Sequence, residues 1–236
     1  MQRNLTIKNP YEPCDAYEVY AFDTKADWKQ GRKDLKGIGG SDSAAAMGES
    51  KWRNNRDLWL IKTGRKEAPD ISDNPAVRYG IFAEKIIREQ FALDNMETYE
   101  VYYKENCILK SKRIQCMLYS PDGILIEKST GRKGVFEIKT SSPATYASWQ
   151  EWEGKIPQQY FIQVLHGMSV MNADFAVLRA YLRKTGGDAI VRNYTLERTD
   201  FQNDIEYIEK NVSAFWKDVE TDKEPPLKIS VKGLEI

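Results

Sequence analysis

A block of short strand-like runs in the middle of the chain does most to constrain its fold. These β-branched or aromatic runs follow one another closely, and PDG and STGRKG turns lie between the later ones. They cover residues 99–104, 113–119, 123–127 and 134–140. Helical patterns come before the block, and a helix, a hairpin and a final helix come after it. The order predicts an α/β fold in which helices flank a central mixed β-sheet.

Glycine, proline and capping residues mark the helices that precede the strands. The segment GIGGSDSAAAMG predicts a loop that enters a helix with Ser41 or Asp42 as its N-cap. RNNRDLWLIKTG predicts a second helix that ends at Gly64. Pro75 begins a third helix, which is expected to extend to about Phe91.

The segments after the strands show a second set of patterns. Residues 142–171 are expected to be helical, with a restart at Pro157. DFAVLRAYLRK and AIVRNYTL, on either side of a Thr-Gly-Gly turn, predict a hairpin. From Phe201 to Val219 the apolar residues share one helical face, which predicts an amphipathic helix before a short irregular tail.

Composition excludes several classes of protein. No run approaches the ~18–20 consecutive apolar residues that a spanning helix needs, which argues against a membrane protein. With 41% hydrophobic residues, six Trp and thirteen Tyr, the chain is too apolar to be intrinsically disordered. At roughly 150 residues per domain, the 236 residues are expected to form one domain, 1–236. Residues 1–35 would be an N-terminal extension, and 201–236 a C-terminal helix and tail.

Cysteine spacing and the N-terminal residues indicate a reducing compartment. Cys14, Cys107 and Cys116 show no C-x-x-C spacing, which argues against a disulfide framework or a four-cysteine metal site. The segment MQRNLTIKNP lacks the apolar stretch of a signal peptide, so we expect the protein in the cytoplasm. The 35 basic and 35 acidic residues cancel. Since nucleic-acid binders usually carry a basic excess, any DNA contact must come from local clustering.

The segment SPDG followed by FEIKT carries the chemistry. The Pro-Asp-Gly turn places Asp122 at the junction of two strands, and Glu137 and Lys139 share one face of the second strand while Ile138 points to the other. Two carboxylates and an ammonium group would then meet. Carboxylate oxygens select Mg²⁺ or Mn²⁺, and a lysine can orient or help deprotonate a water, which suits phosphodiester hydrolysis. The alternative is an ordinary Glu–Lys pair on an exposed strand.

Glu84 lies in the middle of the apolar arc of the predicted 75–91 helix. The arc is formed by Val77, Ile81, Ile87 and Phe91. A carboxylate that faces inward is costly unless it is paired or binds a metal. Glu84 is therefore a candidate metal ligand, and a pair with Arg88 one turn later is the alternative.

Five blocks, in order, resemble a known family. They are W-x-x-x-R with GIGGSDSAAAMG, W-x-x-x-R-D-L-W-L-x-K-T-G, YGIFAEKIIREQF, SPDG…FEIKT and IPQQYFIQVLHGM, between Trp28 and Tyr181. Together they look like the YqaJ-type viral recombinases, relatives of lambda exonuclease in the PD-(D/E)xK nuclease superfamily. The resemblance implies a restriction-endonuclease-like core.

The resemblance also implies roles for the acidic residues. Asp122 and Glu137, with the Ile138 carbonyl, would hold a metal ion, and Lys139 would stand at the attacking water. Glu84 would hold or orient a second ion. Two Mg²⁺ ions are therefore expected in the active site, with Mn²⁺ as the alternative metal.

A helix pattern completes the implied catalytic set. Gln163, with Tyr160 one turn earlier, matches the family's Y-x-x-Q and would position the metal-bound water or the DNA backbone. The alternative is a helix that packs Tyr160 and Val164 into the core, with Gln163 at a sheet edge. His166, among apolar neighbours, is expected to be packed and not catalytic.

Arg32, Ser41 and Ser120 match positions where the family grips a terminal 5′ phosphate. A helix N-terminus offers free N–H groups to an anion, and arginine binds phosphate through two hydrogen bonds. A tight turn with a capped helix and no ligand is the alternative for GIGGSD. Because net charge is zero, the DNA path would be a local channel, with candidates Arg32, Lys33, Lys36, Arg53 and Arg56. Arg132 and Lys133 would touch DNA or remain solvated.

The implied function is a Mg²⁺-dependent 5′→3′ exonuclease that acts on linear double-stranded DNA in phage or prophage recombination by single-strand annealing. Its partners would be duplex ends, an annealing protein and further copies of the chain in a ring, favoured as a trimer, with no membrane contact. The protein would act in the cytoplasm of a bacterial host cell. Two alternatives remain open: an endonuclease or resolvase with the same metal site, and a catalytically silent module that binds DNA ends.

Overall fold

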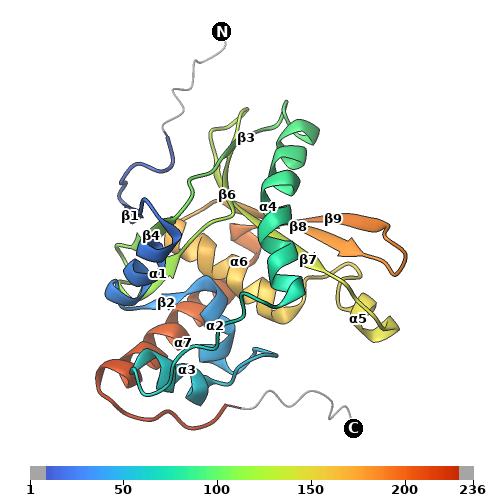
Figure 1. Cartoon of the computed structure of the whole chain (residues 1–236). Coiled ribbons are helices and arrows are strands. Elements are labelled where there is room, and N and C mark those ends of the chain that lie inside the picture. Colours follow the sequence, from blue (N-terminus) through green and yellow to red (C-terminus); the bar gives the residue numbers. More distant parts are fainter. Residues whose placement is uncertain (1–8, 229–236) are drawn as a thin grey trace.

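The computed structural model describes residues 9–228, which form two β-sheets and the helices around them (Figure 1). The strands are β1 (Tyr17–Ala21), β2 (Ile38–Gly39), β3 (Tyr99–Tyr102), β4 (Cys107–Ser111), β5 (Met117–Tyr119), β6 (Gly123–Glu127), β7 (Lys133–Ser141), β8 (Phe175–Arg183) and β9 (Ala189–Glu197). The helices are α1 (Lys25–Asp34), α2 (Gly40–Met47), α3 (Asn55–Lys62), α4 (Pro75–Asp94), α5 (Tyr146–Gln150), α6 (Gln158–Met171) and α7 (Gln202–Glu220). Residues 229–236 of the predicted tail lie outside the described residues.

The larger sheet has the strand order β3-β6-β7-β8-β9 and is mixed, because β7 and β8 run parallel and the other pairs are antiparallel. One face packs against α4, where Ile87 and Phe91 contact Phe136 and Ile138. The other face packs against α6. This confirms the predicted mixed sheet between helices, and it gives β7 two differently covered faces.

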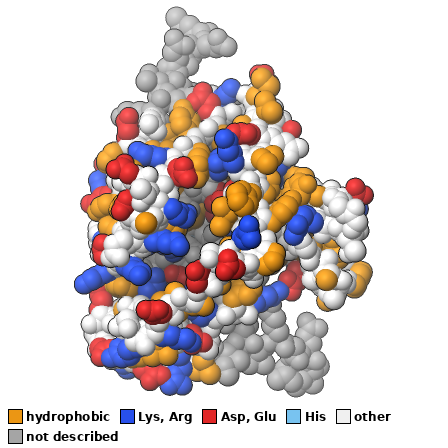
Figure 2. Space-filling view, viewed as in Figure 1, with side chains coloured by type: hydrophobic (Ala, Val, Ile, Leu, Met, Phe, Trp, Pro, Cys, Tyr) orange, Lys and Arg blue, Asp and Glu red, His pale blue; other side chains and the backbone are white. Residues whose placement is uncertain are grey.

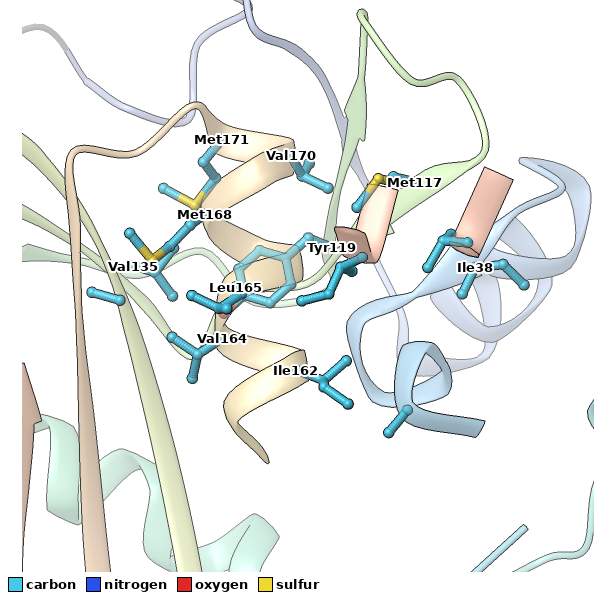
Figure 3. Packing of buried hydrophobic residues seen from close by; sticks show 14 of the residues in the cluster. Ile38, Met117, Tyr119, Val135, Ile162, Val164, Leu165, Met168, Val170 and Met171 are labelled. Carbon is cyan, nitrogen blue, oxygen red and sulfur yellow. The ribbon is translucent and has the colours of Figure 1, made fainter. Parts of the chain in front are cut away.

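Helix α6 packs between the two sheets (Figures 1 and 3). Its buried residues Leu165 and Met168 lie in one cluster with Val135 of β7, and Tyr119 of β5 reaches the same cluster from the second sheet. Helix α7 contributes Ile205, Ile208, Val212 and Phe215 to this core. The amphipathic face of α7 therefore finishes the core of the chain itself.

The smaller sheet has the order β1-β4-β5-β2, and much of it was not predicted. The run 113–119 was predicted as one strand, but only Met117–Tyr119 is extended. Residues 112–116 form a turn instead, because the backbone reverses at Ser111, whose Oγ accepts a hydrogen bond from Ile114 N at 3.0 Å. The strand that pairs with β1 is β4.

The helices predicted before the strands are confirmed, whereas the one predicted directly after the strands is only partly so. Pro75 begins α4 and Gly64, at φ +75°, follows the end of α3, as expected. The helix predicted over 142–171 is wrong in its first half, where only α5 is helical, because Gly154 adopts φ +62° and Pro157 precedes α6. The hairpin predicted on either side of Thr-Gly-Gly is confirmed: β8 and β9 pair antiparallel, and Gly186 and Gly187 lie in the turn between them.

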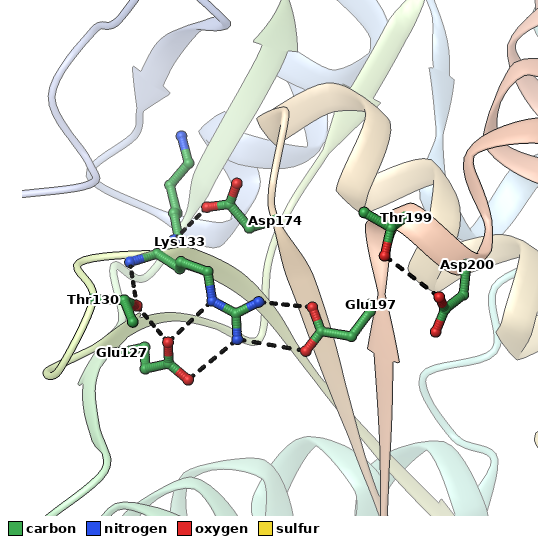
Figure 4. A network of polar contacts seen from close by, with 8 residues as sticks. Glu127, Thr130, Lys133, Asp174, Glu197, Thr199 and Asp200 are labelled. Atoms are coloured by element: carbon green, nitrogen blue, oxygen red, sulfur yellow. Dashed lines mark hydrogen bonds and ion pairs between the residues drawn. The ribbon is translucent and has the colours of Figure 1, made fainter.

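Arg132, in the turn between β6 and β7, ties this turn to the far strand of the sheet (Figure 4). Its guanidinium donates to Glu127 Oε2 at 3.0 Å and to Glu197 Oε2 of β9 at 2.7 Å. Lys133 N donates to Asp174 Oδ2 at 2.9 Å. Arg132 therefore has a structural role in the sheet. Among the described residues, no helix is long and apolar enough to cross a membrane.

Candidate active site

A pocket of about 430 Å³ opens between α1, α4 and the connection from β5 to β6. Figure 2 shows a hollow in this region, with acidic and basic side chains on its rim. Eight of the residues singled out from the sequence line it: Arg32, Ser41, Glu84, Ser120, Asp122, Glu137, Lys139 and Gln163. The ninth side chain, Tyr160, lies beside it, with its ring centroid 5.2 Å from Lys139 Nζ.

Glu137 is the most heavily bonded acid in the pocket. Its side chain is buried on β7, and its Oε1 accepts hydrogen bonds from Lys139 Nζ at 2.7 Å and Gln163 Nε2 at 2.5 Å. Its Oε2 accepts one from Tyr119 Oη at 2.6 Å. Residues of one strand alternate between its faces, so Glu137 and Lys139 face the pocket while Ile138 packs with the α4 cluster.

Asp122 lies next to Glu137 because of strand register. Gly123 of β6 pairs with Phe136 of β7, so the residue before Gly123 meets the residue after Phe136. Asp122 Oδ2 accepts a hydrogen bond from Ile138 N at 2.9 Å. Burial raises the pKa of Asp122 well above its ordinary value, and the charge of Glu137 raises it further. The pocket thus brings together two acids that repel one another.

Glu84 reaches the pocket from α4. Burial raises its pKa, Lys139 partly opposes this rise, and Glu137 adds to it. The ion pairs of the described residues include none between Glu84 and Arg88; Arg88 Nη1 instead donates to the Asp122 carbonyl at 2.9 Å. Ile81 was expected on the buried face of the helix, but it is exposed, because the apolar contacts of α4 with the sheet are made by Ala83, Ile87 and Phe91.

The donor set fits a hard divalent cation. Glu84, Asp122 and Glu137 offer carboxylate oxygens, and Lys139 is the cation that hydrogen-bonds to this acidic group. Oxygen donors of this kind are what Mg²⁺ and Mn²⁺ prefer. Burial, together with the charge of Glu137, raises the pKa values of Asp122 and Glu84, and a bound cation would oppose both effects. Within residues 9–228 no three acidic, His or Cys side chains are already arranged as ligands of one ion, so the fit is in chemistry and charge.

A cluster of cations around Asp42 lies next to the Ser41 side of the pocket, and one of them, Arg32, lines the pocket itself. Lys62 Nζ lies 3.0 Å from Asp42 Oδ2, Arg53 Nη1 lies 3.6 Å from Oδ1, and Arg32 Nη2 lies 4.0 Å from Oδ2. Burial alone would raise the pKa of Asp42, but these cations outweigh burial and lower it. Three cations thus share one carboxylate, which leaves a positive excess beside Ser41.

The N-cap of α2 is Gly39, so the prediction of Ser41 or Asp42 as N-cap is wrong. Both residues lie inside the first turn, because β2 pairs with β5 and leads directly into the helix at Gly40. Asp42 uses its carboxylate for the cations described above. Within the described part of the chain no side chain caps the helix, and a Cβ on Gly39 would come within 2.7 Å of Arg32 Nη2.

Several neighbours of the site were missed by the sequence reasoning. Tyr119 was placed in a strand without a role, and Arg88 was weighed only as a partner of Glu84. The pairing of Asp42 with Lys62 joins α2 to α3 and has no local pattern that could reveal it. A tyrosine at the end of a predicted strand, directly before Ser-Pro-Asp, was the one available signal for Tyr119.

His166 and the proposed DNA-channel residues occupy several different places in the fold. His166 is packed as expected, with Nδ1 2.6 Å from Ser43 Oγ and Nε2 3.0 Å from the Leu118 carbonyl. Among the five channel candidates, Arg32 lines the pocket, and Arg53 lies 3.6 Å from the carboxylate of Asp42, the residue after Ser41. Arg56 pairs with Glu224. The other two, Lys33 and Lys36, line a different cavity, together with residues of α3 and α7.

Comparison with known proteins supports the interpretation of the sequence blocks. A family model described as "YqaJ-like viral recombinase domain" matches residues 27–174. An uncharacterized protein, YqaJ, from Bacillus subtilis (strain 168) is 30% identical over 184 residues, which is 78% of this chain and 53% of that protein. The chain therefore spans about half the length of this curated relative.

Solved structures share the fold. An alkaline exonuclease from Laribacter hongkongensis matches with a TM-score of 0.64 and 23% identity over 84% of this chain and 94% of its own. Its complex with dAMP matches with a TM-score of 0.62 and 19% identity over the same shares, 84% and 94%. A phage-related exonuclease from Haemophilus somnus 129PT gives a TM-score of 0.51 and 13% identity over 81% and 99%. These likenesses confirm the restriction-endonuclease-like core.

Proposed function

Because the chain belongs to the YqaJ-like viral recombinase domain family, we propose that it is a Mg²⁺-dependent 5′→3′ exonuclease. Its substrate would be linear double-stranded DNA, degraded during phage or prophage recombination by single-strand annealing. The observation that carries this proposal is one pocket with an acidic half and a basic half. The acidic half suits phosphodiester cleavage, and the basic half suits a terminal phosphate.

The acidic half would hold the metal. Asp122, Glu137, the Ile138 carbonyl and Glu84 are the proposed ligands of two Mg²⁺ ions, with Mn²⁺ as the alternative. Bound there, the metal would supply Lewis-acid stabilisation of charge on the scissile phosphate. Lys139 already holds its ammonium group at Glu137 and would orient the attacking water. Gln163 fixes the same carboxylate from α6 and would keep it aligned during the reaction.

The basic half would select DNA ends. Arg32, Ser41 and Ser120 line the same pocket as the acids, so a terminal 5′ phosphate held by them would direct the strand toward Lys139. The uncapped N-terminus of α2 adds free backbone N–H groups and a favourable helix dipole. Tyr160, packed beside Lys139, would steady that side chain and border the DNA path.

The proposal extends to partners and setting. We infer a single nuclease domain over residues 1–236 that acts in the cytoplasm of a bacterial host. It would deliver single strands to an annealing protein and assemble with copies of itself into a ring, favoured as a trimer. The amphipathic face of α7 is occupied by the core, so that face is not the ring interface.

The test is nucleotide release from three DNA substrates with Mg²⁺: linear duplex with a 5′ phosphate, the same duplex without it, and closed circular duplex. The expected result is selective loss of the phosphorylated linear strand from its 5′ end. Lys139→Ala should abolish release, while Lys210→Ala, an exposed lysine on α7, should retain it. Full activity of Lys139→Ala would overturn the assignment. Cutting of circles would favour the endonuclease or resolvase, and no release with either metal would favour the silent DNA-end-binding module.

A further inference from the structure

Trp52, in the loop between α2 and α3, is 71% exposed beside the candidate active site. Its ring is not free on both sides: the centroid lies 5.9 Å from that of Tyr160, at an interplanar angle of 44°. Its backbone N donates to Ser50 Oγ at 3.2 Å. A large flat ring is therefore held on one side and open to solvent over most of its surface.

Two ion pairs fix the loop on either side of this ring. Lys51 Nζ donates to Glu151 Oε1 at 2.6 Å, which joins the loop to the end of α5. Arg53 Nη1 lies 3.6 Å from Asp42 Oδ1, which joins it to α2. Because both sequence neighbours are anchored, Trp52 is held in place before any ligand arrives, and a ligand would pay little ordering entropy to use it.

The ring lies close to the catalytic candidates. Tyr160, its contact on α6, also lies with its centroid 5.2 Å from Lys139 Nζ and stacks on Trp152 at 5.6 Å. Trp52 is thus separated from the lysine of the proposed cleavage site by one aromatic ring. A strand whose phosphate lies at Lys139 would bring a neighbouring base within reach of Trp52.

The charge around the loop suits a polyanion. Arg53 belongs to the group of Arg32, Arg53 and Lys62 that shares the single carboxylate of Asp42. Three positive charges against one negative charge leave an excess that attracts phosphates. An exposed indole next to such an excess is the combination by which proteins bind single strands, through base stacking and backbone attraction.

We propose that Trp52 is a stacking platform for an unpaired nucleobase of the DNA strand at the active site. The inference rests on the proposed function in one respect, that the ligand is DNA. Every base has an aromatic face, so the platform binds a single strand next to the cleaved end with little sequence preference. It would hold that strand in place while the next phosphate enters the pocket.

The test is a binding cycle between protein and DNA, in EDTA so that no strand is cut. A short 3′-labelled single strand, and the same strand with abasic residues, are titrated by fluorescence anisotropy against wild type, Trp52→Ala, Trp52→Phe and Tyr207→Ala. Tyr207 is 61% exposed on α7 and serves as the matched control. Thermal melts check that every variant is folded.

The expected result is that Trp52→Ala weakens binding of the base-bearing strand roughly 5- to 100-fold, the usual effect of losing one stacked base. Trp52→Phe retains most of the affinity, Tyr207→Ala retains all of it, and wild type and Trp52→Ala bind the abasic strand equally. An unchanged affinity of Trp52→Ala for the base-bearing strand overturns the inference. An equal loss on the abasic strand, or no binding of the strand by wild type, overturns it too.

The outcome is separable from that of the exonuclease proposal. Nuclease activity together with unaltered binding by Trp52→Ala would refute the platform alone. Binding that depends on Trp52 in a protein that releases no nucleotide would keep the platform and refute the exonuclease.

Discussion

Tyr119 Oη donates a hydrogen bond of 2.6 Å to Glu137 Oε2 from within the core, and so joins the two sheets at the pocket. Tyr119 ends β5 of the smaller sheet, while Glu137 lies on β7 of the larger one. Gly167 of α6 makes room for the tyrosine, because a Cβ there would come within 2.6 Å of its Cζ. The position of the central carboxylate thus depends on a residue outside its own sheet.

Tyr119→Phe is expected to weaken both the fold and the proposed activity. Loss of a hydrogen bond to a charged group costs about 1.5–3 kcal/mol, so urea unfolding should show a decrease of that order. Glu137 would keep Lys139 and Gln163 as partners but lose its anchor on Oε2. Nucleotide release should fall roughly tenfold or more. Tyr207→Phe, on the exposed surface of α7, is the control, and equal behaviour of the two variants would contradict the prediction.

Gly39→Ala is expected to reduce the preference for a 5′ phosphate with little effect on stability. The new Cβ would stand 2.7 Å from Arg32 Nη2, and the end of this flexible side chain would move away at small cost. The backbone at Gly39, with φ −76°, accommodates alanine. The measurement is the ratio of release rates from phosphorylated and unphosphorylated linear duplex. In an Arg32→Ala background the substitution should have no further effect on that ratio, and an additive effect would show that it acts by another route.

Asp42→Asn is expected to destabilise the protein more than a similar change on the surface. The variant leaves Arg32, Arg53 and Lys62 to repel one another without their shared carboxylate. A decrease of about 1–3 kcal/mol in the free energy of unfolding is expected, and added salt should reduce it by screening the cations. Asp222→Asn, which breaks the exposed pair with Arg65, should have a much smaller effect, because solvent screens that pair. Equal losses in the two variants would contradict this account of the cluster.

Acid should destabilise the protein through His166. Burial lowers the pKa of this histidine from 6.5 to about 4, although its hydrogen bond with the Leu118 carbonyl partly opposes the shift. Above pH 6.5 the histidine is neutral in both the folded and the unfolded chain, so its contribution to the free energy of unfolding is fully present. As the pH falls from 6.5 to about 4, the unfolded chain binds a proton that the folded chain does not. The free energy of unfolding should therefore fall by up to about 3 kcal/mol.

Urea unfolding at about pH 7.5, 6.0 and 5.0 measures how the free energy of unfolding depends on pH across the range in which a histidine titrates. His166 is the only histidine in the chain, so His166→Gln removes the group entirely. The variant should show a smaller slope of stability against pH between 6.5 and 5, whatever its stability at pH 7.5. An unchanged slope would show that other groups cause the acid sensitivity.

Local patterns were enough to predict the elements that carry the acids. The strand 123–127 and the strand near 134–140 have the expected pairing, and α4 begins at Pro75 as its helix signal indicated. These elements lie close together along the chain, and each buries a face that its residue order reveals. The alternation of Glu137, Ile138 and Lys139 follows from strand geometry alone. Their meeting with Gln163 and Arg32 in one pocket required the resemblance to a family.

The parts that were missed depend on partners far away in the sequence. Strand β1 pairs with β4 across a long separation, and its residues are mixed polar and aromatic because the strand lies at a sheet edge. The sequence pattern indicated that Asp42 caps a helix, but its carboxylate forms ion pairs with cations from three other segments. Tyr119 has no local pattern that points to Glu137. Such contacts exist only once the two sheets have packed together.

The clamp of Arg132 on Glu127 and Glu197 has a consequence for how the chain tolerates insertions and deletions. It fixes the turn that sets Ile126 opposite Lys133 and Gly123 opposite Phe136. A slip of one residue would turn Glu137 toward the apolar face under α4 and present Ile138 to the pocket. Length changes in this turn would thus abolish the proposed nuclease activity, because the change in register would displace Glu137 at the opposite end of the hairpin. The turn at Gly186 and Gly187 lies between strands that contribute no residue to the pocket, so it is free to vary in length.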